Sequence, residues 1–184
     1  MAIEIPNYKV IKKENNIELR EYQSYVIANV KVAADNYGSA GSQGFGPLAD
    51  YIFGNNTKRN KIKMTAPVST EQSEQIPMTA PVDTSKSGNY YKVSFTMPSI
   101  YSMTNIPTPN NKDVSLEEVP KHKAVVLSFS GYTADKKVES KIEDLKNWAN
   151  KNNIAIKGGA VLSRYDSPWK PGFIRRNEVS FRVN

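Results

Sequence analysis

Residues 64–82 read MTAPVSTEQSEQIPMTAPV, so the five-residue string MTAPV occurs twice, at 64–68 and at 78–82. Proline cannot donate a hydrogen bond to a neighbouring strand, and it holds the residue before it in an extended conformation. Each copy therefore predicts an extended strand that interrupts its own pairing, and the polar residues 69–75 between them are typical of a surface loop. Two interpretations stay open: a long hairpin with two similar arms, or a pocket walled twice by adaptable methionine side chains.

Alternation of apolar and polar residues on both sides of this stretch predicts further β-strands, at 8–13, 17–22, 25–32, 90–97, 114–119, 124–129, 160–165 and 178–183. A helix is expected within 39–53, with Pro47 in its first turn. A second helix is expected at 133–152, where apolar residues recur at helical spacing. Strands interrupted by one helix in each half predict an α+β domain with a largely antiparallel, strongly curved sheet and helices outside. A parallel doubly wound sheet would need a helix between most pairs of strands.

The composition limits the class of protein. A chain of 184 residues predicts a single domain, here taken as 1–184, and the net charge of +7 favours anionic partners. The absence of cysteine excludes disulfides, thiolate metal sites and a cysteine nucleophile. No secretory leader and no apolar run long enough for a membrane span are visible, so we expect a soluble, cytoplasmic protein.

The sequence offers little for catalysis. His122 is the only histidine and lies between Lys121 and Lys123, so it is either an exposed residue at the start of a strand or a metal or haem ligand. Glu117 and Glu118 are adjacent in a predicted strand and point to opposite faces, which is the wrong geometry for an acid–base pair. We therefore assign no catalytic residue and leave the metal ligands open. Nucleic acid is not an expected partner, because no stacking platform or recognition helix is evident.

Basic residues gather beside apolar segments in two places. One cluster, at 58–63, leads directly into the first MTAPV string. Another consists of Lys170, Arg175 and Arg176, which flank the aromatic, proline-bracketed loop at 167–173. Cations beside apolar surface suit a flat, apolar ligand that carries carboxylates.

Several strings together resemble the SOUL/haem-binding-protein family, and they cover nearly the whole chain: YKVI at 8–11, IELREY at 17–22, LADYIFG at 48–54, the run 54–68 with the second MTAPV, WKP at 169–171 and RRNEV at 175–179. The resemblance implies a distorted antiparallel β-barrel with two flanking helices, built as a pseudo-two-fold repeat. It also implies a carrier or buffer for haem or another tetrapyrrole. In the better-studied branch of this family the porphyrin lies noncovalently in an apolar groove against the first helix, with lysine and arginine at its propionates and no obligatory axial ligand.

Carried over to this chain, the resemblance implies a groove lined by Phe45, Leu48, Ile52, Met64 and Met78. Its basic residues are Lys170, Arg175 and, between helix and strand, Lys58 or Lys61. One branch of the family has an axial histidine before the first helix, and this sequence has none there. We expect a binding protein rather than an enzyme. Two alternatives remain: an enzyme that opens the ring or releases the iron of bound haem, and a sensor module for another amphipathic anion. The oligomeric state stays open.

Overall fold

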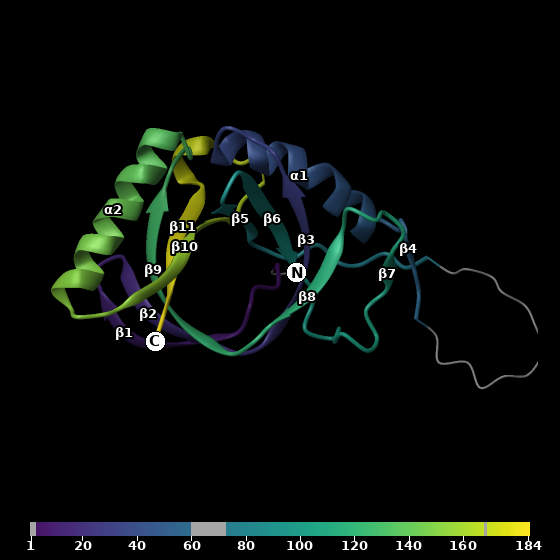
Figure 1. Cartoon of the computed structure of the whole chain (residues 1–184), viewed down its shortest axis with the longest axis horizontal. Coiled ribbons are helices and arrows are strands. Elements are labelled where there is room, and N and C mark those ends of the chain that lie inside the picture. Colours follow the sequence, from purple (N-terminus) through teal and green to yellow (C-terminus); the bar gives the residue numbers. More distant parts are fainter. Residues whose placement is uncertain (1–2, 60–72, 168) are drawn as a thin grey trace, which may run out of the picture.

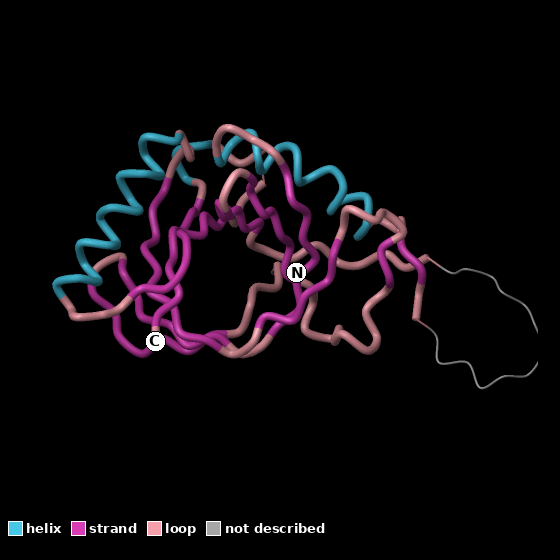
Figure 2. The backbone as a smooth tube through the Cα atoms, viewed as in Figure 1, coloured by secondary structure: helices cyan, strands magenta, loops and turns pink. Residues whose placement is uncertain are grey.

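A computed structural model describes residues 3–59, 73–167 and 169–184. The described residues form a strongly curved, antiparallel sheet of nine strands, with two α-helices on its convex side (Figures 1 and 2). The strands lie in the order β1-β2-β9-β11-β10-β5-β6-β3-β8, and a short pair, β4 with β7, stands apart. The elements are β1 Tyr8–Glu14, β2 Ile17–Tyr22, β3 Tyr25–Val32, α1 Tyr37–Ile52, β4 Asn56–Thr57, β5 Val82–Ser87, β6 Tyr90–Thr96, β7 Thr108–Pro109, β8 Ser115–Val119, β9 His122–Ser130, α2 Asp135–Lys151, β10 Ile156–Arg164, the 3-10 turn Gly172–Ile174 and β11 Arg176–Val183.

The predicted α+β class with a curved antiparallel sheet is confirmed, but the sheet is not closed into a barrel, so that expectation was wrong. In the described part of the chain, β1 pairs with β2 alone and β8 pairs with β3 alone. Both edge strands carry mostly exposed side chains, among them Lys9, Lys12 and Lys13 on β1. Charged edge strands resist further pairing, which explains a sheet that curves without meeting itself.

The order of elements repeats along the chain. In each half a strand leads into a helix and a hairpin follows: β3, α1, β5 and β6, then β9, α2, β10 and β11. Each helix packs on the three strands of its own half, and the two hairpins meet where β5 pairs with β10. Each half therefore has its own apolar cluster between helix and sheet, and the pairing of β5 with β10 joins them.

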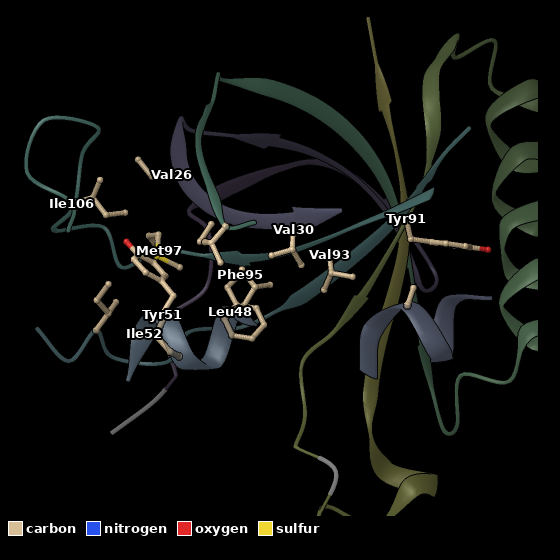
Figure 3. Close-up of a cluster of buried hydrophobic side chains, with 14 residues drawn as sticks. Val26, Val30, Leu48, Tyr51, Ile52, Tyr91, Val93, Phe95, Met97 and Ile106 are labelled. Carbon is tan, nitrogen blue, oxygen red and sulfur yellow. The ribbon is translucent and has the colours of Figure 1, made fainter. Parts of the chain in front are cut away.

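Helix α1 begins two residues before the expected range. Asn36 precedes it and accepts a hydrogen bond from the backbone N–H of Ser39 at 2.8 Å, which caps the first turn. Pro47 lies in the helix interior and not in the first turn as predicted. Gly44 brings the helix against the sheet, because a Cβ at this position would lie 2.6 Å from Val93. This close approach lets Leu48 and its neighbours fill the cluster shown in Figure 3.

The second MTAPV copy is not a strand, so this prediction was wrong. Residues 73–79 have no regular structure, and strand β5 begins only at Val82, the last residue of the copy. The first copy lies outside the described residues. Strand β5 itself was missed because its sequence, VDTSKS, is polar on both faces. It turns into β6 through Gly88, whose φ of 61° lies in the left-handed region that favours glycine.

Candidate functional site

The outer face of α1 combines small and aromatic side chains. Phe45 on the helix is 39% exposed, and Phe53, the residue directly after the helix, is 61% exposed. The Phe45 ring is anchored by Phe95 on β6, with 5.4 Å between ring centroids. A Cβ added to Gly46 would meet no atom within 4 Å. A flat apolar ligand therefore has room to approach the helix backbone on this face.

The sequence-derived groove residues separate into two groups. Leu48 and Ile52 are 0% and 1% exposed, so their side chains are not available to a ligand and instead hold α1 on the sheet (Figure 3). Met78 is 45% exposed, in the irregular segment after α1. Met64 and Lys61 lie outside the described residues. Phe45 and Met78 thus remain the described candidates for apolar contact.

A second apolar surface surrounds the loop between β10 and β11. Trp169 is 92% exposed and Phe173 is 75% exposed. Tyr132, which no sequence motif marked, lies against Gly172 so closely that a Cβ there would clash with its ring. Tyr132 follows β9 and is far from the loop in sequence, so only the fold brings them together. We refer to Tyr132, Trp169 and Phe173 as the aromatic surface.

The aromatic surface carries cations and lies near the beginning of α1. The Arg175 guanidinium lies 5.6 Å from the centroid of the Tyr132 ring, and its Nε donates to the carbonyl of Lys170 at 2.8 Å. Arg164, the last residue of β10, donates from Nη2 to the carbonyl of Tyr37 at 2.8 Å. The loop therefore leaves the sheet beside the first turn of α1.

The two described lysines predicted to meet propionates are not close together. Lys170 pairs with Asp166 at 2.7 Å, near the beginning of α1. Lys58 lies 3.7 Å from Glu74, beyond the end of α1. Because α1 has 16 residues, it is about 24 Å long. Burial raises the pKa of the Asp166 carboxyl, but the hydrogen bonds from Lys170 and the Arg176 backbone outweigh it, and the net effect is a lowered pKa.

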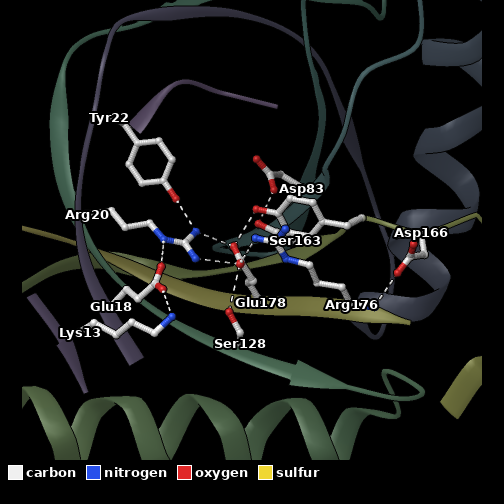
Figure 4. Close-up of polar contacts among 11 residues, drawn as sticks. Lys13, Glu18, Arg20, Tyr22, Asp83, Ser128, Ser163, Asp166, Arg176 and Glu178 are labelled. Atoms are coloured by element: carbon white, nitrogen blue, oxygen red, sulfur yellow. Dashed lines mark hydrogen bonds and ion pairs between the residues drawn. The ribbon is translucent and has the colours of Figure 1, made fainter. Parts of the chain in front are cut away.

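The concave face of the sheet holds a buried polar network (Figure 4). Arg20 and Glu178 are both 2% exposed and form a two-pronged ion pair, with both N–O distances at 2.9 Å. Tyr165 and Arg176 donate to the same carboxylate, each at 2.7 Å. Burial raises the pKa of Glu178, but these donors outweigh it and lower the pKa to about 2. Glu178 is thus a fully paired acid that is charged at neutral pH.

A cavity of about 140 Å³ opens beside this network on the concave face. Tyr25, His122 and Asp83 are among its lining residues. Burial and the nearby Glu178 carboxylate raise the pKa of Asp83 to about 7, against the lowering effect of a hydrogen bond from Ser163. No motif marked this cavity, because its residues come from most of the strands and Asp83 stands in a strand that the sequence did not reveal.

His122 is the first residue of β9, which agrees with the predicted start of a strand, although it was expected to be exposed. It is half-buried, its Nδ1 lies 2.9 Å from the carbonyl oxygen of Pro120, and its ring stacks on Tyr22 with 5.2 Å between centroids. Burial lowers its pKa. The described residues contain no group of three or more His, Cys, Asp or Glu side chains placed to hold a metal ion. None of the helices described is both long and apolar enough to cross a membrane.

Comparisons with known proteins agree with the motif resemblance. The model of the family described as "SOUL heme-binding protein" matches residues 3–182. Heme-binding protein 2 of Mus musculus is 28% identical over 183 residues, which is 97% of this chain and 85% of that protein. Heme-binding protein 1 of Xenopus laevis is 26% identical over 167 residues, covering 91% and 83%.

Solved structures share the fold at low sequence identity. The EcmrR C-terminal domain has a TM-score of 0.64 at 14% identity, covering 96% of this chain and 98% of that one. A structure described as a hydrolase from Listeria innocua has a TM-score of 0.60 at 10% identity, covering 95% and 94%. At these identities the likeness concerns the fold alone.

Proposed function

The chain belongs to the SOUL haem-binding protein family, and from this premise we propose that it binds haem or a related tetrapyrrole noncovalently and acts as its carrier. The proposed site lies on the helix side of the sheet, between the outer face of α1 and the aromatic surface. The observation that carries the proposal is the exposure of Trp169 and Phe173, at 92% and 75%, beside Lys170 and Arg175. Large exposed apolar side chains rimmed by charge commonly mark binding sites.

The residues present fit the chemistry of a porphyrin. Phe45 and the empty space over Gly46 suit the flat, apolar macrocycle, which needs contact area and close approach. A porphyrin has roughly 40 heavy atoms, and at about 0.3 kcal/mol per atom its contacts supply at most ~12 kcal/mol. Ordering of the exposed side chains and desolvation of the propionates reduce this toward ~8 kcal/mol, which is micromolar affinity. Affinity of this size suits a protein that passes its ligand on.

Lys170 is the cation that we assign to the propionates. Its side chain is 38% exposed and its ammonium group is bound to Asp166, so a propionate must share this lysine with a carboxylate already in place. The two propionates of haem leave the same edge of the ring. Lys58 and Lys170 therefore cannot both meet them, because the length of α1 separates the two lysines. The Lys170 end is favoured because the aromatic surface lies there.

A spectral titration of haem tests this proposal. We expect a shift of the Soret band with micromolar affinity, and a loss of about tenfold, or ~1.4 kcal/mol, for Lys170→Glu. Asp166→Asn should strengthen binding by a small factor, since it releases Lys170. Lys58→Glu is the matched control, with the same reversal of charge at the other end of α1.

Two results would contradict the proposal. Absence of a Soret shift well above micromolar haem would remove tetrapyrrole binding altogether. A loss of affinity with Lys58→Glu but not with Lys170→Glu would place the propionates at the far end of α1 and refute the assigned geometry.

A further inference from the structure

The cavity on the concave face is separated by the sheet from the proposed haem site. The side chains of α1 and α2 pack on the convex face, whereas the cavity is lined by the opposite faces of the strands. Its volume of about 140 Å³ is close to that of a cavity that holds one benzene molecule. It is far too small for a porphyrin and suits a ligand of roughly ten heavy atoms or fewer.

Asp83 differs from the other acids around this cavity. Glu178 is neutralised by Arg20 and Arg176, and Glu117 pairs with Lys92. Within the described residues no lysine or arginine forms an ion pair with Asp83. Its side chain accepts a hydrogen bond from Ser163 at 2.5 Å, and the charged group that acts on it is Glu178, which has the same sign (Figure 4). Asp83 is therefore the one carboxylate among the described lining residues without an ion pair. Arg182 also lines the cavity as a cation, but it is not among the groups that shift the pKa of Asp83.

Aromatic rings form much of the wall around this acid. Tyr22 and Tyr25 each pack on His122, with centroid distances of 5.2 Å for Tyr22–His122 and 6.1 Å for Tyr25–His122. The faces of aromatic rings attract cations, and sites for alkylammonium ligands are commonly built from several such rings. A carboxylate without an ion pair and packed aromatic rings in one small cavity favour a positively charged ligand over a neutral or anionic one.

We propose that this cavity binds a small organic monocation of the ammonium class, with the Asp83 carboxylate as its counter-ion and the tyrosine rings as its walls. The site is independent of haem binding, because the two sites lie on opposite faces of the sheet. Ligand binding requires Asp83 to be ionised. Since its pKa is raised to about 7, the apparent affinity should fall as the pH drops below neutral.

Other groups face Asp83 across the cavity and enter the same pH dependence. They are Lys92 on β6, Tyr22 on β2, Tyr25 on β3, Glu117 on β8, His122 on β9, Arg182 on β11 and Tyr165 just after β10, together with Glu178 on β11, which does not line the cavity but acts on Asp83. The tyrosines stay neutral in the acid range, and Glu178 stays charged. Burial lowers the pKa of His122, so its imidazole is protonated only at a lower pH than that of an ordinary histidine. Asp83 is therefore the group expected to control binding between pH 5.5 and 8.5.

The probe is tetramethylammonium, whose charge does not depend on pH, compared with tert-butyl alcohol, a neutral molecule of similar size. Amide chemical shifts of β5, β6 and β10 are followed at constant ionic strength into the millimolar range. We expect tetramethylammonium to bind and tert-butyl alcohol to bind at least tenfold more weakly. The affinity for the cation should rise about thirtyfold from pH 5.5 to 8.5, from the ionised fraction of a group with a pKa of about 7.

Two aspartate variants complete the test. Asp83→Asn should lose at least tenfold in affinity for the cation and lose its pH dependence, whereas Asp113→Asn, at an exposed position, should behave as the wild type. Equal binding of the alcohol, no cation binding in the millimolar range, or an undiminished pH dependence in Asp83→Asn would each overturn the proposal. The comparison of probes and the pH series use the wild-type chain, so they decide the matter even if Asp83→Asn does not fold. Haem affinity should not change with saturating tetramethylammonium.

Discussion

Replacement of Glu178 by glutamine tests the assignment of the concave network as a stabilising element. The carboxylate accepts hydrogen bonds from Arg20, Tyr165, Arg176 and Ser128, and it is 2% exposed. Glutamine has nearly the same shape but carries no charge, and its amide group would donate where the carboxylate accepts. Glu178→Gln therefore leaves the buried Arg20 without its main counter-ion.

The expected cost follows from the pKa of Glu178. Its donors lower the pKa from 4.5 to about 2, and at 1.36 kcal/mol per pKa unit the charged form gains about 3 kcal/mol on folding. Loss of one partner from a buried ion pair typically costs about 3–5 kcal/mol. The lower end is expected here, because Glu18 also contacts Arg20, at 2.8 Å, and retains part of the charge balance.

The pH dependence has a definite sign. Because the pKa of Glu178 is lower in the folded state, its contribution is fully present above pH 4.5 and is lost as the pH falls toward 2. Urea unfolding at pH 7 should show a loss of about 3 kcal/mol for Glu178→Gln, and the gap to the wild type should narrow below pH 4.5. Glu118→Gln, at an exposed position, is the matched control and should change little. A loss below about 1 kcal/mol at pH 7, or a gap that does not change with pH, would refute the reasoning.

Two further predictions concern α1 and the cavity. Gly44→Ala should destabilise the protein, because the new methyl group would meet Val93. Gly46→Ala should have a smaller effect, because its methyl group meets no atom beyond its chain neighbours, although the ring of Pro47 opposes the gain in helix propensity. Urea unfolding of both variants checks this, and equal effects would contradict it. Asp83→Asn should be more stable than the wild type at pH 8 and about equally stable at pH 4. The reason is that folding raises the pKa of Asp83 from 3.8 to about 7, so ionisation of this acid destabilises the folded wild type as the pH rises through that range. Thermal unfolding at the two pH values measures this difference. A variant less stable than the wild type at pH 8 would show that ionised Asp83 does not destabilise the fold.

The sequence was sufficient for elements with a clear period. Helix α2 was predicted at 133–152 and runs from Asp135 to Lys151, because its apolar residues follow a helical repeat on a single face. The strands that fill the apolar clusters were found for the same reason, with a period of two. Strand β5 was missed because its inward residue on the helix side is Thr84, which is fully buried yet polar. A hydrophobic pattern cannot identify a strand whose polar residues are buried only by the elements that pack around them.

The candidate sites were predicted in part, for a similar reason. Lys170 and the loop around it were found because charge and aromatic residues are contiguous in sequence. Leu48 and Ile52 were assigned to the groove, but an apolar residue on an amphipathic helix faces the core by default, and both are buried. Tyr132 and Asp83 were missed because each acquires its neighbours only through the fold, from segments distant in sequence.

Strand register connects the two proposed sites. On β10, Leu162 packs under α2 while Ser163 faces the concave side, and on β5, Asp83 pairs with Ser163 in the same orientation. Because side chains alternate along a strand, a slip of one residue in the β5–β10 pairing would move Asp83 to the helix side. Its carboxylate would then lie in the apolar layer between sheet and helix. The half-buried Asp83 carboxylate is therefore tolerated only on the face that carries the cavity. The register of the β5–β10 pair therefore places Leu162 under the helices and Asp83 on the concave side.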